Sequence, residues 1–130
     1  MKELIIGAKL ENMERVMAFV EAEIADCPQE IKNKLAIVVD EIFSNIAKYA
    51  YYPQSGDAVV RMSVGDEIVI EFADSGAPYN PLEKADPDIT ASASDREIGG
   101  LGVFMVKRIM DEVRYEYRDG QNVLVLRKKI

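Results

Sequence analysis

Asp74 is a charged residue at the end of an apolar segment, because it follows the alternating residues of 68–72. A carboxylate in that place is costly to bury unless a hydrogen-bond donor meets it. The exocyclic amine of adenine is such a donor, whereas guanine presents a carbonyl oxygen at the corresponding edge and would be repelled. Gly76 would let the backbone pass close to a base. Asp74-x-Gly76 therefore predicts an adenine site, and the alternative is an ordinary Asp-x-Gly turn after a strand.

Gly99, Gly100 and Gly102 stand where a polar stretch meets the apolar run VFMVKRIM. Without Cβ atoms, glycines let the backbone approach a phosphate, and the first turn of a helix offers unpaired N–H groups. The motif is not a P-loop, because no Gly-Lys-Ser/Thr follows, and it lacks the third glycine of a dinucleotide fingerprint. The glycines predict either phosphate binding or a helix start that is flexible or tightly packed.

Glu41 and Asn45 lie four residues apart in the segment 35–51, LAIVVDEIFSNIAKYAY. Apolar residues recur at helical spacing along it, which predicts a helix with one broad face on a core. On that helix Glu41 and Asn45 project side by side from one flank, with Ser44 and Lys48 beside them. A carboxylate and a carboxamide on a rigid element form a candidate site, and the alternative is a solvated polar flank.

The elements that must position these residues follow from hydrophobic periods. Period-two segments predict strands and period-3.6 segments predict helices, so the fold class is α+β, a two-layer α/β sandwich with a largely antiparallel sheet. Asn12 is placed to cap the first helix. Residues 75–98 have no periodicity, which favours a functional lid. The expected elements are a strand within 2–10, helices over 13–26 and 28–51, a hairpin over 58–72 turning at 65–66, a helix opened by 99–102 and a hairpin over 113–126 turning at 119–120.

The composition limits the function classes. The chain has 130 residues, 48% hydrophobic, and a net charge of -7, so we expect one domain spanning 1–130 that binds neither nucleic acid nor an anionic membrane directly. The absence of histidine and the single Cys27 exclude Ser-His and Cys-His nucleophiles, an intramolecular disulfide and His- or Cys-based zinc sites. No apolar run could span a membrane, and the N-terminal one breaks at Lys9, so a cytoplasmic location is expected.

Three short boxes follow one another along the chain: Glu41-x-x-x-Asn45, Asp74-x-Gly76 and Gly100-x-Gly102. Their order and spacing strongly resemble the N, G1 and G2 boxes of the GHKL ATPase superfamily. The chain is most similar to the small anti-sigma-factor serine kinases of bacterial partner-switching systems. The resemblance runs from about Ile31 to the C-terminus, and it implies a Bergerat-type ATP-binding fold. That fold has a mostly antiparallel mixed sheet, three helices on one face and a long ATP lid.

The resemblance also implies residue roles. By it, Glu41 would act as general base on a partner's serine, Asn45 would coordinate Mg²⁺ and Asp74 would bind adenine. A hard cation also takes phosphate oxygens and waters, so one protein ligand can suffice. Arg96 would reach the γ-phosphate from the lid, and Lys48 would contact phosphate or remain solvated. The other nucleotide contacts would come from Gly76, Tyr79, Gly99, Gly100, Leu101, Gly102 and Val103.

The implied function is an ATP-dependent protein-serine/threonine kinase that is also an anti-sigma factor, with ATP or ADP and Mg²⁺ as its ligands. Its partners would be a STAS-type anti-sigma factor antagonist as phosphate acceptor, a sigma factor, and a second copy of the chain in a homodimer. The alternative is a nucleotide-gated protein-binding regulator that transfers no phosphate. The catalytic domain of a histidine kinase is disfavoured, because the chain has no histidine to phosphorylate.

Overall fold

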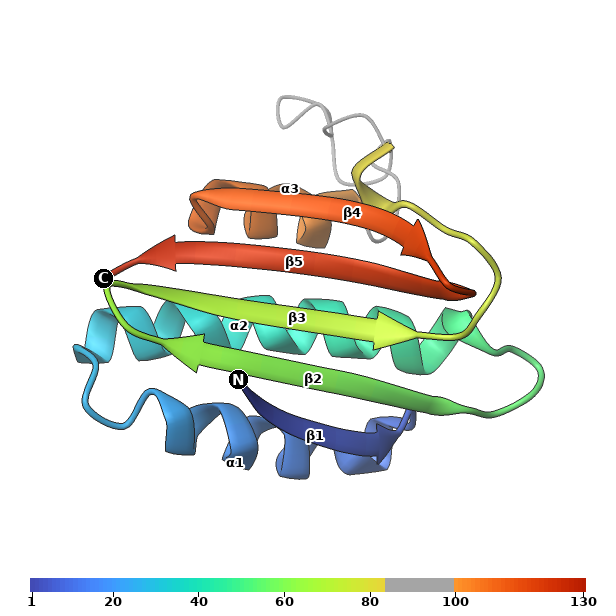
Figure 1. The fold of residues 1–130 in the computed structure, drawn as a ribbon, viewed down its shortest axis with the longest axis horizontal. Coiled ribbons are helices and arrows are strands. Elements are labelled where there is room, and N and C mark those ends of the chain that lie inside the picture. Colours follow the sequence, from blue (N-terminus) through green and yellow to red (C-terminus); the bar gives the residue numbers. More distant parts are fainter. Residues whose placement is uncertain (84–99) are drawn as a thin grey trace.

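The chain folds into two layers, a five-stranded sheet and three α-helices that cover one of its faces (Figure 1). The computed structural model describes residues 1–83 and 100–130. Within these residues the strand order is β1-β2-β3-β5-β4, and every neighbouring pair is antiparallel. The predicted α+β sandwich is confirmed, and the described sheet is antiparallel throughout rather than mixed.

The elements have the order expected from the sequence. The strands are β1 (Lys2–Gly7), β2 (Asp57–Val64), β3 (Glu67–Asp74), β4 (Glu112–Arg118) and β5 (Gln121–Lys129). The helices are α1 (Met13–Glu23), α2 (Gln29–Asn45) and α3 (Gly100–Ile109), with short 3₁₀ helices η1 (Leu10–Asn12) and η3 (Pro81–Glu83). A helix able to cross a bilayer is absent from the described part of the chain.

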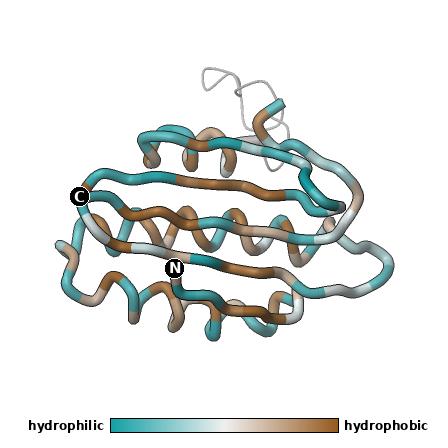
Figure 2. Tube along the Cα trace, viewed as in Figure 1, coloured by the Kyte–Doolittle hydropathy of each residue, from teal (hydrophilic) through white to brown (hydrophobic). Residues whose placement is uncertain are grey.

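The core lies between α2 and the sheet, as the apolar face of the central helix predicts. Leu35, Val38, Val39 and Phe43 on α2 have no exposed surface, and Val16 of α1 is equally buried. Figure 2 shows apolar stretches along the strands and apolar residues recurring along the helices that pack on them. The single core holds α2 rigidly against β2 and β3, so side chains on the flank of α2 have fixed positions.

The two hairpins set the register of the sheet. The turn between β4 and β5 has positive φ angles at Asp119 (54°) and Gly120 (78°), the conformation of a type I′ turn. It confirms the hairpin predicted from this dipeptide. From there the register places Asn122, at the beginning of β5, directly opposite Asp74 at the end of β3. The end of one strand and the beginning of another therefore meet at one edge of the sandwich.

Three local details differ from the sequence-based expectation. Asn12 precedes α1, but its side chain does not cap the helix: Nδ2 donates to the carbonyl of Gly7 at 2.9 Å. The first helix ends at Glu23 rather than near residue 26. The central helix changes form at its end, because α2 passes into a π-helical segment, η2 (Ile46–Ala50). Such segments occur frequently at functional sites.

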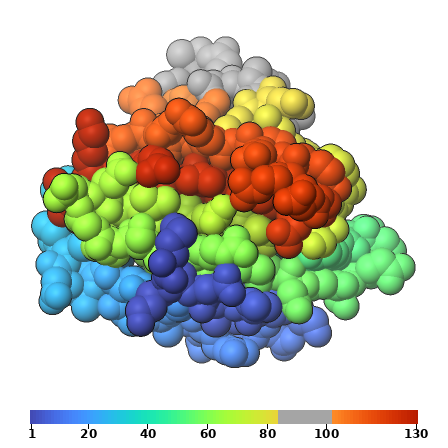
Figure 3. All heavy atoms as spheres, in the orientation of Figure 1, coloured from blue at the N-terminus to red at the C-terminus, as the bar shows by residue number. Residues whose placement is uncertain are grey.

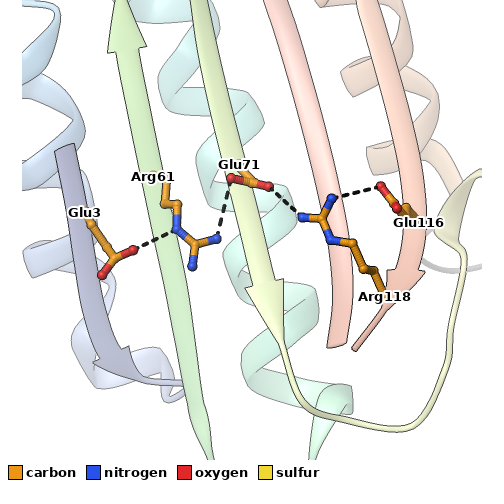
Figure 4. A network of polar contacts seen from close by, with 5 residues as sticks. All are labelled: Glu3, Arg61, Glu71, Glu116 and Arg118. Carbon is orange, nitrogen blue, oxygen red and sulfur yellow. Dashed lines mark hydrogen bonds and ion pairs between the residues drawn. The ribbon is translucent and has the colours of Figure 1, made fainter. Parts of the chain in front are cut away.

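The sheet face away from the helices carries ordered charges. In the orientation of Figures 1 and 3 this face is turned to the viewer, and no described helix covers it. Figure 4 shows the charged side chains that link four strands across it. Glu71 is central, with Oε2 3.5 Å from Arg61 Nη1 and Oε1 3.8 Å from Arg118 Nη2. The same two arginines also pair with Glu3 and Glu116. This network lies on the opposite side of the sheet from the helices and the core.

Candidate functional site

A cavity of about 540 Å³ lies between the end of α2, the end of β3 and the beginning of β5. Its volume is that of a small-molecule site, and such sites combine apolar walls with a few polar groups. Asp74, Asn45, Asn122 and Tyr115 are the polar side chains that define it. The apolar walls come from both layers and include Ile42, Ile46, Phe72, Val103 and Leu124. This arrangement suits a flat, mostly apolar ring with one polar edge.

Asp74 lines this cavity with one half of its carboxylate engaged by the protein. The residue is 7% exposed, and Oδ1 accepts hydrogen bonds from the Gly76 N–H at 2.9 Å and from Asn122 Nδ2 at 3.0 Å. The Asp-x-Gly turn considered above is therefore formed through Oδ1. Among the described residues nothing donates to Oδ2, so a buried carboxylate oxygen is left for a donor in the cavity.

Asn122 ties the beginning of β5 to the loop that follows β3. Its Nδ2 donates to Asp74 Oδ1 and to the carbonyl of Ala77, both at 3.0 Å. Its Oδ1 accepts from the backbone N–H of Tyr79 at 2.9 Å and from the hydroxyl of Tyr115. Burial raises the pKa of the Tyr115 phenol, and the charge of Asp74 acts in the same direction. The hydroxyl therefore stays protonated and donates.

Gly76 brings the loop against the end of the helical layer. A Cβ at this position would lie 2.1 Å from the carbonyl oxygen of Ala50, so only glycine fits there without a backbone shift. Tyr51 holds the same junction, because its hydroxyl accepts from the Ser75 N–H at 2.7 Å and donates to the carbonyl of Asp57 at 2.6 Å. The absence of a side chain at Gly76 thus admits the end of η2, and the predicted approach of Gly76 to a base stays a prediction.

Glu41 and Asn45 are paired on the flank of α2, as their spacing predicts. Asn45 Nδ2 donates to Glu41 Oε1 at 2.9 Å. The carboxylate of Glu41 also lies against the first turn of α3, where a Cβ on Gly102 would come within 2.2 Å of both its oxygens. Asn45 lines the cavity, whereas Glu41 lies just outside it, one turn back along α2. The pair thus extends from the cavity toward the beginning of α3.

Comparison with known proteins places this geometry in a family. The sequence pattern of the histidine kinase-like ATPase domain matches residues 6–128. The chain belongs to the histidine kinase-like ATPase family. The resemblance to the GHKL ATPases noted from the three boxes is confirmed, and membership implies an ATP-binding domain.

Several curated proteins are similar to this ATPase domain. The serine/threonine-protein kinase BtrW of Bordetella bronchiseptica is 30% identical over 95 residues, which cover 71% of this chain and 66% of that protein. The serine-protein kinase RsbW of Listeria monocytogenes is 28% identical over 97 residues, 70% of this chain and 62% of its own length. The anti-sigma F factor of Clostridium acetobutylicum is 28% identical over 130 residues, 98% of this chain and 91% of its own length. The matched region spans just under two thirds of the first two relatives.

Within the ATPase domain the remaining predicted site residues lie in different places. Val103 is buried in the cavity wall, and Tyr79 is 57% exposed at the rim. Lys48 is exposed and does not line the cavity, which agrees with a solvated side chain. Gly100 begins α3, and Leu101 follows it in the same turn.

The predicted lid, 75–98, is described only in its first part. Residues 75–83 are fixed to the domain, because η3 lies within them and Leu82 packs against the core. Arg96 and Gly99, with the rest of 84–99, lie outside the described residues.

Sequence reasoning missed the residues that hold Asp74 in place. Asn122 and Tyr115 lie far from Asp74 in the chain and belong to no recognisable motif. One signal was available: the Asp119-Gly120 turn fixes the hairpin register, and Asn122 is the polar residue directly before the apolar run of β5. A buried amide at that point calls for partners, as the carboxylate of Asp74 does.

Proposed function

We propose that this chain is an ATP-dependent protein kinase that transfers the γ-phosphate to a serine of a partner protein. The observation that carries the proposal is the order of polar groups along the site. The Asp74 carboxylate lies in the cavity, Asn45 lies in its wall, and Glu41 lies beyond Asn45 at the beginning of α3. A base bound at Asp74 would direct its phosphates past Asn45 toward Glu41.

Asp74 supports adenine as the base. Its Oδ2 is an acceptor with no donor among the described residues, and the 6-amino group of adenine would supply one. The apolar walls would pack on both faces of the ring, and the exposed Tyr79 at the rim would contact the nucleotide as it leaves the cavity. Guanine would bring a carbonyl oxygen to the same carboxylate and would be rejected.

Asn45 supports a Mg²⁺ ion beside the phosphates. Because its Nδ2 donates to Glu41, its amide oxygen points away from that carboxylate and is available as a hard ligand. No cluster of three or more acidic, His or Cys side chains capable of holding a metal occurs in residues 1–83 and 100–130. A cation here would therefore share its coordination among Asn45, phosphate oxygens and water. When bound, it would neutralise charge that develops on the transferred phosphate.

Glu41 supports the chemical step. Its carboxylate would accept the proton of the serine hydroxyl as the serine oxygen bonds to the γ-phosphorus and the bond to the β–γ bridging oxygen breaks. The products would be phosphoserine, ADP and a proton on Glu41. The hydrogen bond from Asn45 orients Glu41 for this role, and the close approach of Gly102 keeps it at the phosphate end of the site.

The relatives support a partner-switching role. Two of them are named serine-protein or serine/threonine-protein kinases, and another is named an anti-sigma factor. By this likeness the serine would belong to a STAS-type antagonist, a sigma factor would be a second partner, and two copies of the chain would form a dimer. ATP as phosphate donor suits a reaction in the cytoplasm.

The deciding experiment incubates the protein with γ-labelled ATP, Mg²⁺ and a candidate antagonist encoded beside it. The expected result is label on a serine of the antagonist, dependent on Mg²⁺ and lost in Glu41→Gln. The same samples should bind ATP in calorimetry. Bound Mg-ATP without any label on protein would overturn the kinase and support a nucleotide-gated regulator instead.

A further inference from the structure

Asn122 uses its entire side-chain hydrogen-bonding capacity within the protein. The residue is 8% exposed, and its amide has two N–H donors and one oxygen with two acceptor sites. The donors reach Asp74 Oδ1 and the carbonyl of Ala77, and the acceptor sites receive the Tyr79 N–H and the Tyr115 hydroxyl. Although Asn122 lines the cavity, it has no polar group to spare for a ligand.

The chemistry of the partners fixes the orientation of this amide. A backbone N–H such as that of Tyr79 can only donate, so the amide oxygen must face it. A carboxylate and a backbone carbonyl can only accept, so the nitrogen must face Asp74 and Ala77. A rotated amide would set donor against donor and acceptor against acceptor. Asn122 is therefore locked with an N–H directed at Asp74.

We propose that Asn122 is a positioning residue for nucleotide selection, acting through the carboxylate of Asp74. By bonding Oδ1 together with the Gly76 N–H, it prevents the carboxylate from rotating and leaves Oδ2 as the oxygen available to the cavity. The site then offers one fixed acceptor and selects a purine that carries a 6-amino group. This inference rests on the proposed nucleotide site, and it assigns the base selectivity of that site to a residue outside the three boxes.

Tyr115 supports Asn122 from the neighbouring strand. Its hydroxyl donates to Asn122 Oδ1, and the whole of β4 pairs with β5. Because burial raises the pKa of this phenol, the donor persists across the neutral and mildly alkaline range. Tyr115→Phe would remove one of the bonds to Asn122 while keeping the ring in the wall. It is the mildest way to loosen the amide.

A merely structural role for Asn122 makes a different prediction from a positioning role. If the residue only stabilises the loop after β3, its loss weakens all nucleotides by the same factor. If it holds Asp74 in place, its loss weakens only the part of binding that comes from the 6-amino group. Purine riboside triphosphate lacks the 6-amino group. Its dissociation constant divided by that of ATP is a ratio that separates these cases.

The test measures this ratio by calorimetry with Mg²⁺ for the wild type and for Asn122→Ala. In the wild type the ratio should be roughly tenfold to 150-fold, the usual value of a hydrogen bond to a charged group. In Asn122→Ala the ratio should fall below about threefold, because a carboxylate that is free to rotate and to bind water no longer selects the amine. Tyr115→Phe should give an intermediate ratio. Gln121→Ala, which removes an amide from the opposite face of β5, should leave the ratio unchanged.

Asn122→Asp keeps the shape and gives a second readout that does not depend on the alanine variant folding. The new carboxyl would lie beside Asp74, so the two carboxyl groups would share a proton at low pH and repel each other when both are ionised. At low pH the shared proton restores a donor to Asp74, and at higher pH two negative charges face each other. ATP affinity relative to wild type should therefore fall at least roughly tenfold between about pH 5 and pH 8.

The outcomes separate this proposal from the proposed function. The positioning role is overturned if the ratio stays at the wild-type value in Asn122→Ala and Tyr115→Phe and the relative ATP affinity of Asn122→Asp does not fall between about pH 5 and pH 8. ATP binding by the wild type would then leave the nucleotide site intact. A wild type that binds ATP and purine riboside triphosphate equally overturns amine selection altogether. A wild type that binds neither nucleotide removes the proposed function, and this inference with it.

Discussion

Asp74→Asn should reverse the base preference of the site. The Gly76 N–H and Asn122 Nδ2 both donate to Oδ1, so the new amide must keep its oxygen on that side. Its NH₂ group is then forced into the place of Oδ2, facing the cavity. The fixed acceptor becomes a fixed donor. A 6-amino group would face another donor there, whereas a 6-carbonyl oxygen would accept a hydrogen bond from the new NH₂ group.

The magnitude follows from the bond that is exchanged. A hydrogen bond to a charged group contributes about 1.5–3 kcal/mol, so ATP affinity should fall by about tenfold to 150-fold. Inosine triphosphate differs from ATP at the 6-position, where it carries a carbonyl oxygen. It should gain from the same substitution by about 0.5–1.5 kcal/mol, the net value of a neutral hydrogen bond in a buried site.

Calorimetric titration of both nucleotides, with Mg²⁺ present, measures the reversal. Glu71→Gln is a matched control, because it makes the same carboxylate-to-amide change on β3 but on the face opposite the cavity. Its nucleotide affinities should equal those of the wild type, with a loss of stability below about 1 kcal/mol, as for a partly exposed ion pair. Unchanged ATP affinity in Asp74→Asn, with inosine triphosphate no tighter, would refute the assignment of Oδ2 to the base.

The other site residues have distinct expected phenotypes. Glu41→Gln should bind Mg-ATP normally while phosphate transfer falls by about 10²–10⁴-fold, whereas Asn45→Ala should weaken nucleotide binding with Mg²⁺ and much less with chelator. Calorimetry and a label-transfer assay compare them, and similar phenotypes would contradict separate roles. Gly102→Ala should fold normally, since the flexible Glu41 side chain can move aside, yet transfer phosphate poorly. Gly76→Ala should lose about 1–3 kcal/mol in urea unfolding, because its Cβ meets the backbone of Ala50.

The fold was largely predictable, because its elements follow local patterns. The apolar stripe of 35–51 and the two-residue alternation of the hairpins each have one physical solution, a face on a common core. The Asp119-Gly120 dipeptide predicts its own turn, and both positive φ angles confirm it. The Glu41–Asn45 hydrogen bond was also foreseeable, because helical geometry alone brings those side chains together.

The partners of Asp74 could not be predicted in the same way. Asn122 is 48 residues away along the chain, and although the Asp119-Gly120 turn fixes its place in the hairpin, nothing local in β5 shows that it faces Asp74. The close contact of Gly76 with η2 could not be predicted either, since the oxygen that excludes a Cβ belongs to Ala50 at the end of η2. Contacts of this kind depend on how layers pack, and short-range patterns carry no information about them.

The two ends of the site are built by different layers, which bears on how it would respond to substitution. Asp74 and Asn122 belong to paired strands, whereas Glu41 and Asn45 belong to α2 and meet α3 at Gly102. The loop after β3 joins the ends where Gly76 lies on Ala50. Substitutions in the strands should therefore alter which nucleotide binds. Substitutions on α2 should alter what happens to the phosphates of the bound nucleotide. Only a change at that junction should disturb both, because it alone shifts the sheet edge relative to the helix.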